Sequence, residues 1–154
     1  MKQKILLVLV LLFGAIQFVR PHPNTAAGLG PNDIAAKYQI PPDVQTVLQK
    51  ACYDCHSNNT RYPWYAQVQP VGWWLANHIS EGKRHLNFSE FLAYDAKRAP
   101  KKLKKAADEL TEHDMPLTSY TLIHRDARLT PAETKLVADW ADALAEQITP
   151  AKSR

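Results

Sequence analysis

Residues 52–56 read Cys52-Tyr53-Asp54-Cys55-His56, the pattern C-x-x-C-H. On a helical turn Cys52 and Cys55 are i, i+3 neighbours, so both thiols face the same way and can form thioethers with two vinyl groups of one porphyrin. His56 follows directly, where its imidazole can reach the iron as the proximal ligand. The pattern is typical of c-type haem attachment. It predicts one covalent haem c, with its iron, in a domain too small to enclose the cofactor by packing alone.

Other uses of paired cysteines fit this chain less well. A thioredoxin-type C-x-x-C opens a helix near a βαβ pattern, but the chain shows hardly any strand-type alternation. A zinc site usually needs a second paired-ligand motif, and the remaining histidines form no such pair. A disulfide between Cys52 and Cys55 would be strained within a helix and would not explain His56.

Apolar residues recur at helical spacing on both sides of the motif. The last helix has Thr130 as N-cap, Pro131 at its first position and Glu133 two residues later, which together form a capping box. We expect further helices over residues 42–55, 71–79 and 89–97 and from Pro100, and a helical turn at 33–38. The predicted fold class is all-α, a small cytochrome c-like helical domain around one covalent haem.

The basic residues are concentrated at the N-terminus. The 154 residues include 19 Lys and Arg and 15 Asp and Glu, a net charge of +4. Lys2, Lys4 and Arg20 precede the first acidic residue, Asp33, so the remaining chain is nearly neutral. A general nucleic-acid binder is therefore not expected.

Residues 5–19 form an apolar run behind the basic stretch Met1–Lys4, as in an export signal or a membrane anchor. No convincing small-x-small cleavage site follows. A helix of this length spans about 22 Å, less than the roughly 30 Å of a bilayer core, although Lys4 and Arg20 can snorkel. By the positive-inside rule we expect a single N-terminal helix in the cytoplasmic membrane, with the haem domain in the periplasm or an equivalent exterior space. Signal cleavage, leaving a soluble periplasmic protein, is the alternative.

These observations divide the chain into three parts. Residues 1–20 are the signal or anchor segment. Residues 21–42 are rich in proline and are expected to form an irregular tether. Residues 43–150 are expected to form the haem-binding domain.

Met115 is the only methionine after the start codon, and it stands in Asp114-Met115-Pro116. Pro116 prevents the preceding helix from continuing, so the thioether lies in a rigid loop that can direct it at a haem plane. We interpret Met115 as the distal iron ligand; a gap-filling core methionine is the alternative. His78, on the apolar stripe of residues 71–79, is the competing ligand.

Aromatic and basic residues supply further candidates. Trp64, Trp73 and Trp74 are expected to wall the haem crevice, and Arg61 is positioned after the motif to neutralise a propionate. A basic cluster is either a solvated helix face or a docking patch for an acidic redox partner. It comprises Lys97, Arg98, Lys101, Lys102, Lys104 and Lys105.

The order of motifs adds a family resemblance. The landmarks are residues 52–60, 62–65, 73–74, 87–91, 115–116 and 130–133, and Trp140. This series resembles the small haem-binding domain of exported bacterial proteins, and residues 16–21 look like the anchor end seen in that family. The resemblance implies a monohaem c-type cytochrome-like domain in which Cys52 and Cys55 carry the haem, His56 is proximal and Met115 is distal.

The first functional interpretation is one-electron transfer to and from a redox partner protein that the sequence does not identify. In this interpretation the chain is an electron carrier rather than an enzyme, anchored to the cytoplasmic membrane by its N-terminal helix. A peroxidase-like haem enzyme is the alternative, with His113 or His124 as acid or base if Met115 moves away. A haem-based redox or gas sensor is a further alternative.

Overall fold

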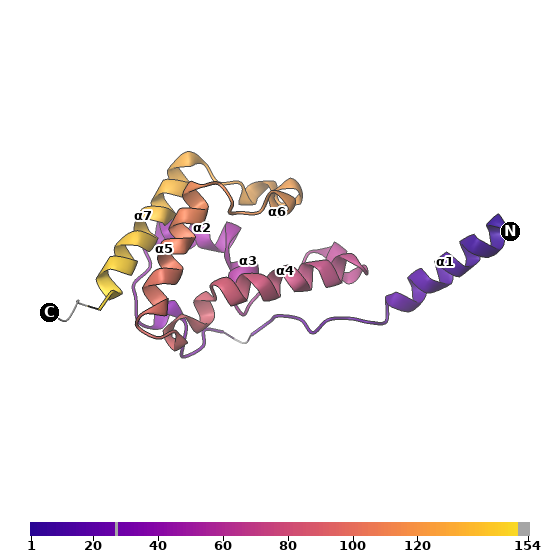
Figure 1. Cartoon of the computed structure of the whole chain (residues 1–154), viewed down its shortest axis with the longest axis horizontal. Helices are drawn as coiled ribbons and strands as arrows, with labels where there is room; N and C mark the ends of the chain where they lie inside the picture. The colour runs from indigo at the N-terminus through magenta and orange to yellow at the C-terminus, as the bar shows by residue number, and fades with distance from the viewer. Residues whose placement is uncertain (27, 151–154) are drawn as a thin grey trace.

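The computed structural model describes residues 1–26 and 28–150 (Figure 1). The elements in chain order are α1 (Lys2–Ile16), η1 (Ile34–Ala36), α2 (Pro42–Ala51), α3 (Tyr53–His56), η2 (Trp64–Gln67), α4 (Val71–His85), η3 (Phe88–Ala93), α5 (Arg98–Thr111), α6 (Thr118–Ile123), η4 (Arg125–Ala127) and α7 (Pro131–Ile148). Within the described ranges the only extended pairing is an isolated bridge between Thr25 and Asn59. The prediction of an all-α fold is confirmed for this part of the chain.

Most of the buried apolar surface lies between α5 and α7, which run side by side in Figure 1, with α2 packed against α7. The apolar sides that face each other bury side chains such as Leu103 and Leu144. Removing these side chains from water on folding stabilises the structure. Sixteen buried residues from α5, α7, α2 and neighbouring segments form one apolar core, which we call the main cluster. Ile34, within the proline-rich segment 21–42, is fully buried in it. Part of that segment therefore packs on the domain.

The predicted start of α7 is confirmed in atomic detail. The Glu133 backbone N–H donates to Thr130 Oγ1 at 3.2 Å, and the Thr130 backbone N–H donates to Glu133 Oε2 at 2.9 Å. Pro131 occupies the first helical position, where its missing N–H costs no hydrogen bond. These local contacts set where α7 begins and so align its apolar stripe with α5.

The other side of the domain has far less apolar support. Helix α4 packs on α3 at Gly82, where a Cβ atom would lie only 2.7 Å from the carbonyl oxygen of Cys55. Only glycine allows the two backbones to approach this closely. We call the buried residues behind α4 the small cluster; it comprises Ala66, Leu75 and Ile79.

Two predicted helices differ from the observed ones. The expected helix over 42–55 is interrupted at Cys52, whose carbonyl accepts from the backbone N–H groups of Cys55 and His56 and so starts a new turn, α3. The expected helix over 89–97 is the shorter 3-10 segment η3, with Asn87 as its cap and a non-helical Glu90 inside. The short helices η2, α6 and η4 were not predicted.

Helix α1 projects away from the domain, at the indigo end of the chain in Figure 1. It has 15 residues, and none of them is buried. Over residues 1–26 and 28–150, no helix combines the length and the apolar character needed to cross a membrane. The prediction of a membrane-spanning helix within residues 1–20 therefore has no support in the fold.

Candidate cofactor site

A cavity of about 680 Å³ lies between the α3–α4 side and the α5–α7 side. Pockets that hold drug-sized ligands and cofactors usually measure about 300–1,000 Å³. Much of its wall is apolar, including Leu103, Leu110, Val137, Trp140 and Ala141. Five residues predicted from the sequence line this one cavity: Cys52, Cys55, His56, His78 and Met115. Segments far apart in the chain thus bring two thiols, two imidazoles and a thioether to one apolar space, a donor set that fits a covalent haem.

One ring nitrogen of His56 is engaged in a hydrogen bond to the backbone. Its Nδ1 lies 2.9 Å from the carbonyl oxygen of Leu86, and because a carbonyl only accepts, Nδ1 carries the proton and donates. The Nε2 lone pair is then free for a metal. Burial lowers the pKa of His56 and keeps the imidazole neutral, the form that binds iron.

The two cysteines are free thiols in a desolvated environment. Burial raises the pKa of Cys52 to about 12 and that of Cys55 to about 11, so both remain protonated at neutral pH. A thioether carries no charge and suits such a site better than a zinc-bound thiolate does. No group of three or more His, Cys, Asp or Glu side chains able to hold a bare metal ion occurs among the described residues.

The end of α5 turns the chain so that Met115 reaches the cavity. The His113 N–H donates to the Leu110 carbonyl, and the Asp114 and Met115 N–H groups both donate to the Glu109 carbonyl. These bonds form the Schellman pattern that ends many helices. His113 adopts the required left-handed conformation, with φ of 64°. Met115 therefore approaches the cavity from the end of α5, whereas His56 comes from α3 and His78 from α4.

Asp54, between the two cysteines, connects the motif to the segment that follows Met115. Its carboxylate accepts hydrogen bonds from the backbone and side chain of Arg61 and, at 2.8 Å, from the hydroxyl of Tyr120 on α6. Burial and this bond raise the pKa of Tyr120 well above its usual range. The Tyr120 ring stacks on His124, whose Nε2 lies 2.6 Å from the hydroxyl of Tyr65. We call Asp54, Tyr120, His124 and Tyr65 the polar clamp.

Four residues of the predicted basic cluster line the cavity together with Arg84 and His85, and we call these six residues the basic rim. The rim residues are Arg84, His85, Arg98, Lys101, Lys102 and Lys105. Lys102 Nζ donates to the carbonyls of Arg84 and His85, so it also caps the C-terminal end of α4. Lys97 and Lys104 do not line the cavity.

The structure does not bring Arg61, Trp73 and Trp74 to the cavity lining. Arg61 pairs with Asp54, with Nε 3.2 Å from Oδ1. Trp73 and Trp74 lie at the start of α4 and are partly exposed. Trp140, used above only as a family landmark, is the tryptophan that lines the cavity.

Three residues that shape the site were not predicted from the sequence: Gly82, Tyr120 and Asp54. Gly82 had a usable signal, because a lone glycine inside a helical pattern often marks a close backbone approach. The pairing of Tyr120 with Asp54 spans 66 residues and leaves no spacing pattern.

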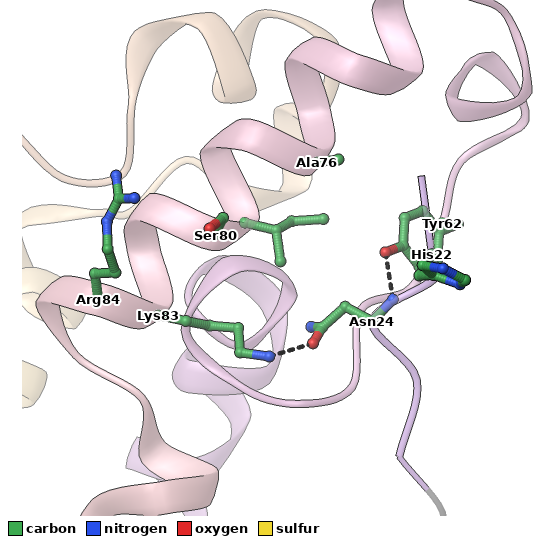
Figure 2. Close-up of a pocket in the computed structure, with 8 residues that line it drawn as sticks. His22, Asn24, Tyr62, Ala76, Ser80, Lys83 and Arg84 are labelled. Atoms are coloured by element: carbon green, nitrogen blue, oxygen red, sulfur yellow. Dashed lines mark hydrogen bonds between the residues drawn. The ribbon is translucent and has the colours of Figure 1, made fainter. Parts of the chain in front are cut away.

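A second, shallower cavity of about 400 Å³ lies on the outer face of α4 (Figure 2). There Asn24 receives a hydrogen bond from Lys83 and donates through its backbone N–H to the hydroxyl of Tyr62. Its side-chain amide also bonds Ser57 and Thr60 just after the motif. None of the predicted ligands lines this cavity. It lies where Asn24 of the proline-rich segment bonds Lys83 of α4.

Residues 11–143 match the family model described as a haem-binding domain. The chain therefore belongs to the haem-binding domain family. No curated protein and no solved structure matches the chain. The matched range contains every residue that lines the large cavity, and haem is the cofactor that the family implies.

Proposed function

We propose that the chain carries one covalent haem c and transfers single electrons. The observation that supports this proposal most strongly is the shared lining of one apolar cavity by Cys52, Cys55, His56 and Met115. A bound haem supplies one-electron Fe(III)/Fe(II) chemistry. The chain would supply the attachment points, the side chains that bind the iron and an apolar cavity that keeps water from it.

In this proposal His56 Nε2 and Met115 Sδ would hold the haem iron. The hydrogen bond from His56 Nδ1 to Leu86 orients the imidazole and makes it a better donor to the metal. Met115 is favoured over His78 because it reaches the cavity from α5, while His78 shares the α3–α4 side with His56. A methionine ligand favours the ferrous state and raises the reduction potential.

A peroxidase-like function has less support. It requires an acid or base beside an open distal position. Neither His113 nor His124 lines the cavity. His124 is instead engaged by Tyr65 and Tyr120 in the polar clamp, and His113 serves the turn that ends α5.

The basic rim supports an acidic protein as redox partner. Lys101 and Lys105 are exposed side chains at the cavity, Lys105 paired with Glu109, so a partner bound there would lie close to the haem. Positive charge at such a surface speeds encounter with an acidic partner and loses this effect in high salt.

We also propose that the domain works at the outer face of the cytoplasmic membrane. The supporting features are Lys2 and Lys4 at the start of α1, the apolar run that follows, and the exposure of its side chains from Ile5 to Phe13 in the folded chain. N-terminal sequencing of the mature protein separates a retained segment from a cleaved signal.

The optical spectrum and carbon monoxide binding test the proposed electron carrier. The oxidised protein should show the weak long-wavelength sulfur-to-iron charge-transfer band, and the reduced protein should not bind carbon monoxide. Met115→Ala should remove the band, lower the reduction potential and admit carbon monoxide, whereas His78→Ala should do none of these. If the unmodified protein lacks the sulfur band, and His78→Ala rather than Met115→Ala admits carbon monoxide, His78 is the ligand. An unmodified protein that binds carbon monoxide freely would contradict the proposed carrier function.

A further inference from the structure

An exposed aromatic surface lies at the end of α4 that is remote from the motif. Trp64 is 81% exposed, and Trp73 and Trp74 remain 36% and 46% exposed. Val68 and Val71 add apolar surface beside them. We call these five residues of η2 and the start of α4 the tryptophan corner. Tryptophan is costly to leave in water, and none of the three lines the cofactor cavity.

The end of α1 is fixed to this corner by hydrogen bonds. Gln17 Nε2 donates to the Gln69 carbonyl at 3.1 Å, and the Gln69 backbone N–H donates to Gln17 Oε1 at 2.8 Å. The Trp73 indole N–H donates to the Val19 carbonyl at 2.7 Å, and Arg20 Nη1 donates to Gln67 Oε1 at 2.8 Å. Gln69 is itself only 1% exposed, so this is an anchored junction and not a passing contact.

The exposed apolar surface of the corner continues along the side chains of α1. From Ile5 to Phe13 every side chain is between 52% and 63% exposed, with no side sheltered by the domain. A helix that binds a protein groove usually presents one apolar stripe and keeps the opposite face polar. From Ile5 to Phe13 helix α1 is apolar on every side, which suits immersion in lipid.

The border between the two apolar parts has the composition of a membrane interface. Tryptophan side chains collect at the level of lipid headgroups, where the ring is buried and the N–H is hydrogen-bonded. Arg20 stands at the same level, where a guanidinium can reach lipid phosphates.

From these contacts we propose that the tryptophan corner rests in the headgroup layer of a lipid bilayer, with α1 immersed in its apolar interior. The proposal builds on the membrane location proposed above and adds the orientation of the domain. The α4 residues that line the cofactor cavity begin at His78, about 10 Å along the helix from Val71 at 1.5 Å per residue. The corner therefore holds the start of α4 at the lipid surface while the cavity stays outside it.

Tryptophan fluorescence of the full-length haem protein tests this orientation. The protein is reconstituted in vesicles of phosphatidylcholine and phosphatidylglycerol, with and without phosphatidylcholine brominated near the headgroup end of its chains. Energy transfer to haem falls steeply with distance, so Trp140, which lines the cavity, is quenched most strongly and the residual emission comes mainly from the corner. We expect brominated lipid to quench most of the remaining emission. Trp64→Gln should reduce the quenchable part, and Leu122→Gln, at an exposed apolar residue of α6, should leave it unchanged.

A Phe13→Trp variant separates this proposal from the membrane location on which it rests. If the added emission is quenched while the native tryptophans are not, α1 enters lipid and the orientation is wrong. If neither is quenched, the membrane location fails as well. Equal quenching of native protein and Trp64→Gln would also overturn the role of the corner. Protection of the corner by dimerisation, with no lipid quenching, would assign it to a second copy of the chain instead.

Discussion

The two sides of the cofactor cavity are built on very different amounts of core. The α5–α7 side rests on the main cluster of sixteen buried residues. The α3–α4 side has the three residues of the small cluster, the close approach at Gly82, and a strap of polar contacts through Asn24. Apolar burial is the main favourable term in folding, so one side can hold its shape alone and the other depends on what fills the cavity. Cys52 packs against the main cluster and Cys55 against the small cluster, so a haem bonded to both cysteines would join the weaker side to the stronger one.

The largest effect we expect follows from this difference. Loss of the two proposed thioether bonds should destabilise the α3–α4 side much more than the α5–α7 side. Cys52→Ala/Cys55→Ala should leave α4 with an opening free energy close to zero, because the small cluster is then the main apolar support that α4 retains. Helices α5 and α7 should retain most of their protection. Hydrogen exchange measured by mass spectrometry, peptide by peptide, reports both sides in one sample. Equal loss of protection on the two sides would show that the main cluster also depends on haem.

Matched leucine truncations compare the two clusters directly. Leu103→Ala removes a fully buried side chain of the main cluster and should lower the free energy of unfolding by about 2–5 kcal/mol. Leu75→Ala, in the small cluster, should cost about 2 kcal/mol or less, because few buried neighbours lose contact. Denaturant unfolding of the haem protein measures both. A larger cost at Leu75 would reverse the comparison.

The polar clamp predicts a smaller effect that is specific to the distal side. Tyr120→Phe removes the hydrogen bond to Asp54 and should cost about 1.5 kcal/mol, as expected for a bond to a charged acceptor. It should also loosen the segment that carries Met115, so carbon monoxide should bind the reduced protein measurably. Tyr65→Phe is the matched control, because it removes a hydroxyl that bonds His124 and not Asp54. Equal carbon monoxide binding by the two variants would show that the bond between Tyr120 and Asp54 does not specifically hold Met115 in place.

The smallest expected change is a gain in stability at the end of α5. His113 has φ of 64°, a conformation that costs an L-residue with a side chain roughly 1–2 kcal/mol and costs glycine little. His113→Gly should therefore raise the free energy of unfolding by about 1 kcal/mol or less, with the long-wavelength band retained. Thermal unfolding measures the gain. A loss of stability would mean that the His113 side chain makes a compensating contact.

Much of the fold could be predicted from local sequence signals. The capping box of Thr130 and Glu133 acts within four residues, so it is readable before the fold is known, and the structure confirms it. The apolar periodicity of α5 likewise indicates its buried face. In α4 the predicted stripe is only partly correct, because Leu75 and Ile79 are buried while Val71 and Trp74 are exposed. The break at Cys52 and the short helix α6 could not be predicted in this way, because they depend on contacts with distant segments.

In the candidate site, too, the residues with local sequence signals could be predicted and those placed by distant contacts could not. Cys52, Cys55 and His56 are close in sequence, and Met115 stands out because the chain has so few methionines. The tryptophans were expected at the cavity from their residue type alone. The structure instead brings Trp140 to the cavity and leaves Trp73 at the junction with α1. Composition does not tell which side of a helix pair a large aromatic residue will face.

The covalent bond between this chain and haem is the claim on which the account depends, and intact mass under denaturing conditions tests it most directly. The protein is produced in cells that export it and mature c-type haem, and it is then unfolded in acid and organic solvent. We predict that the unmodified chain retains the added mass of one haem, and that Cys52→Ala/Cys55→Ala has the mass of the polypeptide alone. An unmodified chain that releases its haem and titrates as two free thiols would contradict the account.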